Sequence, residues 1–174
     1  MILRSIIVVA VLILAVFAFA ASKPNTFRVQ RSLTINAPPE KIFALINDFH
    51  RWRNWAPQDK EDPTMTRTYS GTSAGAGAVS EWDSRGSAGK GRMSITESAP
   101  TRISIRVDFM KPFEAHNSNE FTLEPAEAST NVTWSMQGTN LYFMKVVSIF
   151  VNMDRMAGKH FEAGLNNLKT LAEK

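Results

Sequence analysis

Residues 102–110 read RISIRVDFM, and apolar and polar side chains alternate along this stretch without a break. One side of an extended chain would carry Ile103, Ile105, Val107 and Phe109. Strict alternation of this kind is the pattern of a half-buried β-strand. The stretch therefore predicts a strand with one face turned to an apolar core, and it sets the fold of its surroundings.

Similar but weaker patterns lie on both sides of this strand. They predict further strands at residues 27–37, 65–70, 78–84, 91–97, 115–124 and 131–137. Gly71, Gly75 and Gly77 predict a hairpin turn, not a phosphate-binding loop, because a strand follows them where such a loop needs a helix. Arg31 interrupts the apolar face of the first strand, which predicts a bulge or a partly open face there. Strands at this spacing indicate an antiparallel sheet.

Helical patterns frame these strands. Pro38-Pro39-Glu40 predicts a helix start, and a second short helical stretch over residues 49–56 is expected to end at Pro57. A long helix is predicted over residues 142–172 from an apolar stripe of helical period. The predicted fold class is α+β, with a curved antiparallel sheet of about seven strands wrapped on the C-terminal helix and two short helices after the first strand.

The N-terminus is a separate segment. Residues 5–22 form an uncharged run of 18 residues, which suits a single-pass transmembrane anchor over residues 1–22. The alternative is a cleaved signal peptide, with Arg4 as its basic region and Ala18-Phe19-Ala20 as the cleavage motif. The charges on either side of this run do not determine on which side of the membrane the residues after it would lie. Residues 23–26 are a predicted linker, and residues 27–174 a single domain.

Composition excludes several functions. The 20 Lys and Arg residues are scattered against 16 Asp and Glu, so nucleic acid is not an expected partner. The chain has no cysteine, which excludes a thiol nucleophile, a disulfide and cysteine-based metal sites. His50, His116 and His160 lack the spacing of metal ligands. We therefore expect neither a metal nor a cofactor.

Four stretches carry a resemblance to a known family. They are TINAPPEKIFALINDFHRWRNWAP (34–57), GTSAGAGAVSEW (71–82), GRMSITESAPTRISIRVDFMKPF (91–113) and NVTWSMQG (131–138). Together the chain resembles the SRPBCC superfamily, and within it the polyketide cyclase/dehydrase branch. The resemblance implies a helix-grip fold with an elongated ligand cavity between sheet and helix. Members of the superfamily include lipid carriers, hormone receptors and cyclases, so the fold alone does not assign a function.

Aromatic, methionine and asparagine side chains are the candidate ligand contacts. The candidates on predicted inward positions are Trp52, Trp55, Trp82, Met93, Phe109, Trp134, Met136, Phe150 and Met153, with Met156 beside them. Asn117 and Asn119 share the inward side of their strand and need partners, so they are the candidate polar contacts. The expected function is binding of a small hydrophobic molecule or lipid by a membrane-associated protein.

Two alternatives remain. A cyclase- or dehydrase-type enzyme would need an acid in the cavity, and Glu81 is the weak catalytic candidate. If Trp82 points inward, however, Glu81 and Asp83 must point to water. The other alternative is a non-catalytic interaction module. Residues 141–153 are apolar nearly all round, which fits either burial at the sheet mouth or a gate that meets lipid.

Overall fold

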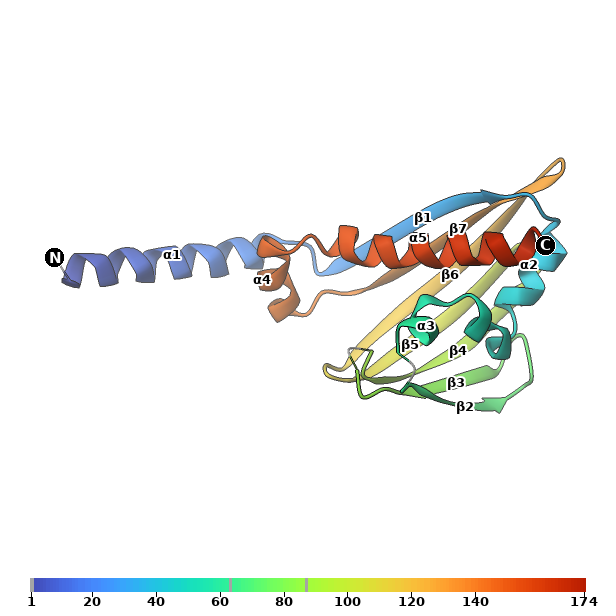
Figure 1. The fold of residues 1–174 in the computed structure, drawn as a ribbon. Coiled ribbons are helices and arrows are strands. Elements are labelled where there is room, and N and C mark those ends of the chain that lie inside the picture. Colours follow the sequence, from blue (N-terminus) through green and yellow to red (C-terminus); the bar gives the residue numbers. More distant parts are fainter. Residues whose placement is uncertain (1, 63, 87) are drawn as a thin grey trace.

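The fold is a seven-stranded sheet with a long helix packed along one face. The computed structural model describes residues 2–62, 64–86 and 88–174. The strands are β1 (Thr26–Ile35), β2 (Thr66–Gly71), β3 (Ala78–Asp83), β4 (Lys90–Ala99), β5 (Arg102–Lys111), β6 (Ala115–Ala126) and β7 (Ser129–Thr139). All neighbours pair antiparallel in the order β1-β7-β6-β5-β4-β3-β2. The predicted α+β class and the antiparallel seven-stranded sheet are confirmed (Figure 1).

Three short helices, not two, follow β1. They are α2 (Pro39–Ile46), the 3₁₀ helix η1 (Phe49–Asn54) and α3 (Pro57–Glu61). The expectation that Pro57 ends a helix is wrong, because Pro57 begins α3. A proline has no N–H to donate and is preset for the first helical turn, where that N–H would have no partner.

The predicted helix over residues 142–172 is divided in two. Helix α4 (Tyr142–Phe150) ends before the extended residue Val151, and α5 (Met153–Ala172) begins after Asn152. The side-chain oxygen of Asn152 accepts a hydrogen bond from the Arg155 backbone N–H at 2.9 Å. Asparagine at this position supplies a partner for an N–H at the start of a helix, so it favours a new start over continuation. The chain turns at this break, and α4 lies across the end of the fold (Figure 1).

One end of the space between sheet and helix is filled by aromatic rings. Trp134 of β7 stacks on Phe161 of α5, with ring centroids 4.3 Å apart, and on Phe121 of β6 at 4.9 Å. Trp52 and Trp55 close this cluster, and their indole N–H groups donate to the carbonyl oxygens of Ile46 and Leu45. We call this end the packed half; the helices α2, η1 and α3 cover it.

Arg31 ties α5 to the sheet. The pairing of β1 with β7 runs through Arg31 without a register shift, so of the two expectations, a bulge or a partly open face, the bulge does not occur. The Arg31 side chain instead forms ion pairs with Asp154 at 3.0 Å and Glu162 at 2.8 Å, both on α5. Gly158 lies between these carboxylates, and a Cβ there would lie 1.8 Å from the guanidinium. A helix glycine thus makes room for the arginine that holds the helix.

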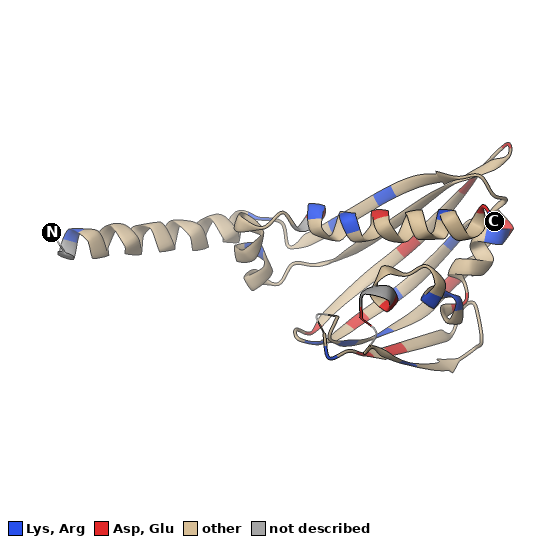
Figure 2. Ribbon diagram, in the orientation of Figure 1, with Lys and Arg blue, Asp and Glu red and all other residues tan. Residues whose placement is uncertain are grey.

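The N-terminal segment is one apolar helix, α1 (Ile2–Ser22), which projects from the end of the domain where α4 lies (Figure 1). Residues Arg4–Ser22 are long and apolar enough to cross a membrane, a test that a signal sequence also passes. Figure 2 shows no charged residue on α1 after Arg4. The last turns of α1 contact α4, where the Tyr142 hydroxyl donates to the Phe17 carbonyl at 2.8 Å.

Candidate functional site

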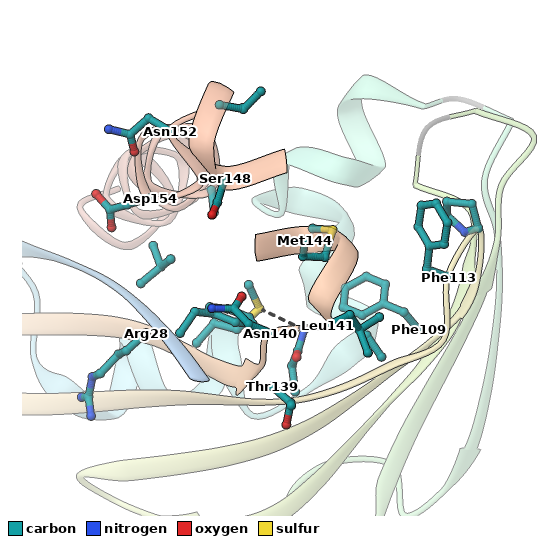
Figure 3. Close-up of a pocket in the computed structure, with 18 of the residues that line it drawn as sticks. Arg28, Phe109, Phe113, Thr139, Asn140, Leu141, Met144, Ser148, Asn152 and Asp154 are labelled. Carbon is teal, nitrogen blue, oxygen red and sulfur yellow. Dashed lines mark hydrogen bonds between the residues drawn. The ribbon is translucent and has the colours of Figure 1, made fainter. Parts of the chain in front are cut away.

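A cavity of about 760 Å³ lies at the end of the fold opposite the packed half. Its walls come from β1, the end of β5, the β5–β6 turn, β6, β7, α4 with the residues on either side of it, and the start of α5 (Figure 3). The apolar lining consists of Phe27, Val29, Phe109, Pro112, Phe113, Ala115, Met136, Leu141, Met144, Ile149, Phe150, Val151 and Ala157. The same strands and the same helix that build the packed half therefore enclose an open half.

The break between α4 and α5 shapes this cavity. A continuous helix would carry residues 142–150 onward along the axis of α5, whereas the observed turn brings Met144 and Ile149 to the cavity wall. Lys145 holds α4 in this position, since its buried ammonium donates to the Lys23 carbonyl at 2.9 Å and to the Asn25 side-chain oxygen. Lys23 donates in return to the Ser148 carbonyl at 3.0 Å. The linker after α1 and the cavity wall are thus one unit.

Asn117 is a polar side chain of the cavity lining and a candidate ligand contact. It lies on the inner face of β6, opposite Gly138 of β7, where a Cβ would come within 2.0 Å of the Asn117 side-chain oxygen. The Asn117 amide nitrogen lies 3.9 Å from the Met136 sulfur, a weak contact. Its Oδ1 has no hydrogen-bond partner among the described residues. A buried acceptor in this state costs about 1–3 kcal/mol, so a donor on a ligand would be favoured there.

Charge at the cavity is confined to its rim. Asp154 is the one carboxylate among the described lining residues, and it accepts hydrogen bonds from Arg31. These bonds, and then those from Arg31 to Glu162, raise the pKa of Arg31 above its ordinary value. Arg28 and Lys111 supply the positive charge of the rim. The neutral polar groups of the otherwise apolar lining are the amides of Asn117, Asn140 and Asn152 and the hydroxyls of Thr139 and Ser148.

The predicted contact residues separate into three groups. The cavity is lined by Phe109, Asn117, Met136 and Phe150. The core holds Trp52, Trp55, Trp82, Met93, Asn119 and Trp134, all buried and none of them on the cavity wall. Met156 is exposed, and the side chain of Met153 lies outside the described residues. Trp82 still supports the wall from behind, because its ring packs edge-on against Phe109 at 5.5 Å.

Glu81 does not reach the cavity. Trp82 is buried and donates its indole N–H to the Ala88 carbonyl at 3.0 Å, so Glu81 and Asp83 point to solvent on the other face of β3. The weak catalytic assignment to Glu81 is therefore corrected. Within the ranges that the structure describes, no group of three His, Asp or Glu side chains is placed to hold a metal ion.

Several cavity residues escaped the sequence analysis. Phe27 is on the apolar side of β1, where the strand pattern predicts an inward direction but not a cavity. Phe113 follows a proline in a turn, where no periodicity marks its direction. Leu141, Met144 and Ile149 belong to the apolar stretch of residues 141–153, whose composition indicated a special role without showing which side chains face inward.

Comparison with solved structures shows the same fold in distant proteins. Protein CV1439 from Chromobacterium violaceum superposes with a TM-score of 0.59 at 19% identity, covering 87% of this chain and 99% of that one. The di-domain ARO/CYC StfQ from the steffimycin biosynthetic pathway gives 0.64 at 8% identity, over 85% of this chain and 51% of that one. Ara h 8.0201 gives 0.57 at 14% identity, over 84% and 97%. At these identities the likeness establishes the fold alone.

Sequence comparison assigns the family. No curated protein matches the chain significantly. One family profile does, described as polyketide cyclase / dehydrase and lipid transport, and it covers residues 26–173. This range contains every strand of the sheet and both cavity-lining helices. The chain therefore belongs to the polyketide cyclase / dehydrase and lipid transport family.

Proposed function

We propose that this protein binds a small hydrophobic molecule or lipid in the cavity between its sheet and helices α4 and α5. The observation that carries the proposal is the cavity itself, about 760 Å³ with a mainly apolar lining. Pockets for small molecules commonly have volumes of about 300–1,000 Å³ and combine apolar walls with a few polar groups. Among the polar lining residues, Asn117 is the one whose buried side-chain oxygen has no partner in the described part of the chain, and it favours a ligand with an apolar body and one hydrogen-bond donor.

Helix α1 makes the protein membrane-anchored in this proposal. The segment Arg4–Ser22 has the length of a bilayer span, and its surface is exposed except where it meets the domain. Its last turns contact α4, so a domain that keeps α1 would hold the cavity beside the bilayer. A signal peptide removed after export is the alternative, and N-terminal sequencing of the mature protein distinguishes the two.

The geometry favours binding over cyclase or dehydrase chemistry. Such chemistry needs a positioned acid or base near the substrate. Glu81 lies in solvent, and Asp154 is held in an ion pair with Arg31 at the rim. An interaction module without a ligand is disfavoured as well, because such a module has no use for an apolar cavity of this size.

Native mass spectrometry of the full-length chain, extracted from membranes in mild detergent, tests the proposal. The wild-type protein should retain a bound lipid or hydrophobic molecule as a discrete mass. Ala157 of α5 lines the cavity, so Ala157→Phe should fill the space and remove the adduct. Ala163 lies on the exposed side of the same helix, and Ala163→Phe is the matched control that should retain it. A wild-type protein without an adduct, or equal adducts on all three proteins, would contradict the proposal.

A further inference from the structure

The exposed apolar side chains of the domain gather at one place. Outside α1, the large hydrophobic side chains that are exposed within the described chain are Met110, Phe113, Leu141, Tyr142, Phe143, Phe150, Val151 and Met156. They lie at the end of β5 and in the β5–β6 turn, in α4 and the residues on either side of it, or in the first turn of α5, and the rest of the domain surface has none among the described residues. Exposed apolar side chains that gather in one part of a protein surface mark a binding surface.

Five of these residues form what we call the apolar rim: Phe113, Leu141, Phe143, Phe150 and Val151. Four of the five also line the cavity, the exception being Phe143. The Phe143 ring packs against Phe113 with centroids 5.5 Å apart, which joins α4 to the β5–β6 turn. Phe150 is 74% exposed, more than any other large apolar side chain described. The rim therefore surrounds the mouth of the cavity and faces outward.

Helix α1 sets where this rim lies. Its apolar stretch, Arg4–Ser22, has 19 residues and a length of about 28 Å at 1.5 Å per residue. A hydrocarbon core is about 30 Å thick, so every turn of α1 is needed to cross it. Phe17 lies about 7 Å before the end of the helix and is therefore inside the hydrocarbon boundary. Its ring stacks on Tyr142 with centroids 6.3 Å apart, so the start of α4 must enter the bilayer surface with it.

We infer that the apolar rim is a membrane-docking surface, which inserts into the same bilayer leaflet that α1 leaves. The side chains have the chemistry of that region, because aromatic residues concentrate at membrane interfaces and lysines reach from there to the headgroups. Lys23 and Lys111 lie beside the rim, and Arg155 follows it in the first turn of α5. A second copy of the chain is the competing occupant, but it has no comparable reason to meet α1 and the rim together.

The inference rests on α1 as a membrane span and not on a filled cavity. Docked in this way, the cavity mouth opens onto the bilayer, and only this consequence depends on the proposed ligand-binding function. The hydrogen bonds of Lys23 and Lys145 make the arrangement stiff, because they join the end of α1 to α4. The rim is therefore held at a fixed depth in the bilayer, because these hydrogen bonds prevent free movement of the domain relative to α1.

Single-cysteine labelling of the full-length chain tests this inference, since the natural sequence has no cysteine. Phe113→Cys and Phe150→Cys place a fluorophore on the rim, and Ala128→Cys places it on the exposed β6–β7 turn at the opposite end. Each protein is reconstituted in phosphatidylcholine vesicles containing phosphatidylglycerol. Flotation establishes that the chain is inserted, and the label is quenched with acyl-chain nitroxide lipid or with aqueous acrylamide.

We expect nitroxide lipid to quench the two rim labels severalfold more than the Ala128→Cys label, with acrylamide showing the reverse order. Equal acrylamide quenching at all three positions would overturn the inference. So would rim labels that are protected from both quenchers and become exposed as protein is diluted in lipid, because a second copy would then cover the rim. Failure of the chain to float with vesicles would overturn the span on which the inference rests, independently of any ligand.

Discussion

The two halves of the interior are built by the same strands and the same helix, but one half is filled with side chains and the other encloses a cavity. Trp134 and Met136 are two residues apart on the same face of β7, yet Trp134 is 1% exposed within stacked rings while Met136 borders an open cavity. The difference comes from what covers each end. Two tryptophans from the helical segment after β1 fill the packed half. At the other end the chain bends at Val151, so α4 does not continue along the axis of α5, and this half stays open. Inward direction alone therefore does not make a residue part of a binding site.

The largest expected effect is at Trp134. Trp134→Ala would leave a void among four aromatic rings and should lower the free energy of unfolding by about 3–5 kcal/mol. Met136→Ala should cost about 1 kcal/mol, because this side chain already borders open space. Denaturant unfolding followed by far-ultraviolet circular dichroism measures both. Equal losses would remove the distinction between the halves.

Substitutions that add volume should show the same contrast between the two halves. A Cβ at Gly164 would lie 2.6 Å from the Trp134 ring, so Gly164→Phe should destabilise the protein by about 3 kcal/mol through overpacking. Ala157 is two helical turns earlier, and Ala157→Phe should change stability by less than about 1 kcal/mol because the new ring enters the cavity. Thermal unfolding of the two variants tests this. A large loss at Ala157 would show that the cavity is not available space.

Asn117 sharpens the comparison within the open half. Asn117→Ala should weaken binding of a hydrogen-bonding ligand by about 0.5–1.5 kcal/mol, or roughly two- to thirteenfold in the dissociation constant. Its stability should not fall, because the Oδ1 removed has no partner among the described residues. Isothermal titration with the ligand identified by mass spectrometry checks the prediction. An unchanged dissociation constant would exclude Asn117 as a ligand contact.

The smallest effect concerns pH and belongs to the packed half. Glu173 accepts a hydrogen bond from the Asn36 backbone N–H at 2.7 Å, and this bond, with a second from Lys169, lowers the pKa of Glu173. A lowered pKa means that the stabilisation is present above the unfolded-state pKa of about 4.5 and disappears as pH falls through the folded-state value.

Wild-type protein should therefore lose more thermal stability than Glu173→Gln as the pH falls from about 5 to 3. Melting temperatures across this range measure the difference between the two proteins. Glu127→Gln, in the exposed β6–β7 turn, is the control and should follow the wild type. A constant difference between wild type and Glu173→Gln at every pH would contradict the role assigned to this carboxylate.

Much of the fold followed from side-chain alternation. The period-two pattern of residues 102–110 and its neighbours gave seven strands, and it gave the inward direction of Asn117 correctly because pairing preserves parity. The pattern does not predict whether an inward-facing residue lies in the packed half or beside the cavity. Trp134 and Met136 have the same parity, and only the packing of distant helices distinguishes filled from open space.

Local chemistry that competes with periodicity was harder to predict. The apolar stripe of residues 142–172 continues through Val151 and Asn152, but the asparagine side chain favours a helix start and ends the continuity. Arg31 looked like a defect in β1 because its two carboxylate partners lie more than a hundred residues away. The cavity depends on the helix start at Asn152, and the attachment of α5 to the sheet depends on Arg31.

Photo-crosslinking tests the central claim most directly, namely that the open half holds a hydrophobic ligand. The full-length chain in native membranes is exposed to a diazirine-bearing fatty acid, irradiated and digested, and the modified peptides are identified by mass spectrometry. The claim predicts adducts at Phe109, Met136 and Ile149, inside the cavity, and their loss in Ala157→Phe with retention in Ala163→Phe. Adducts confined to α1, or unchanged by Ala157→Phe, would contradict it.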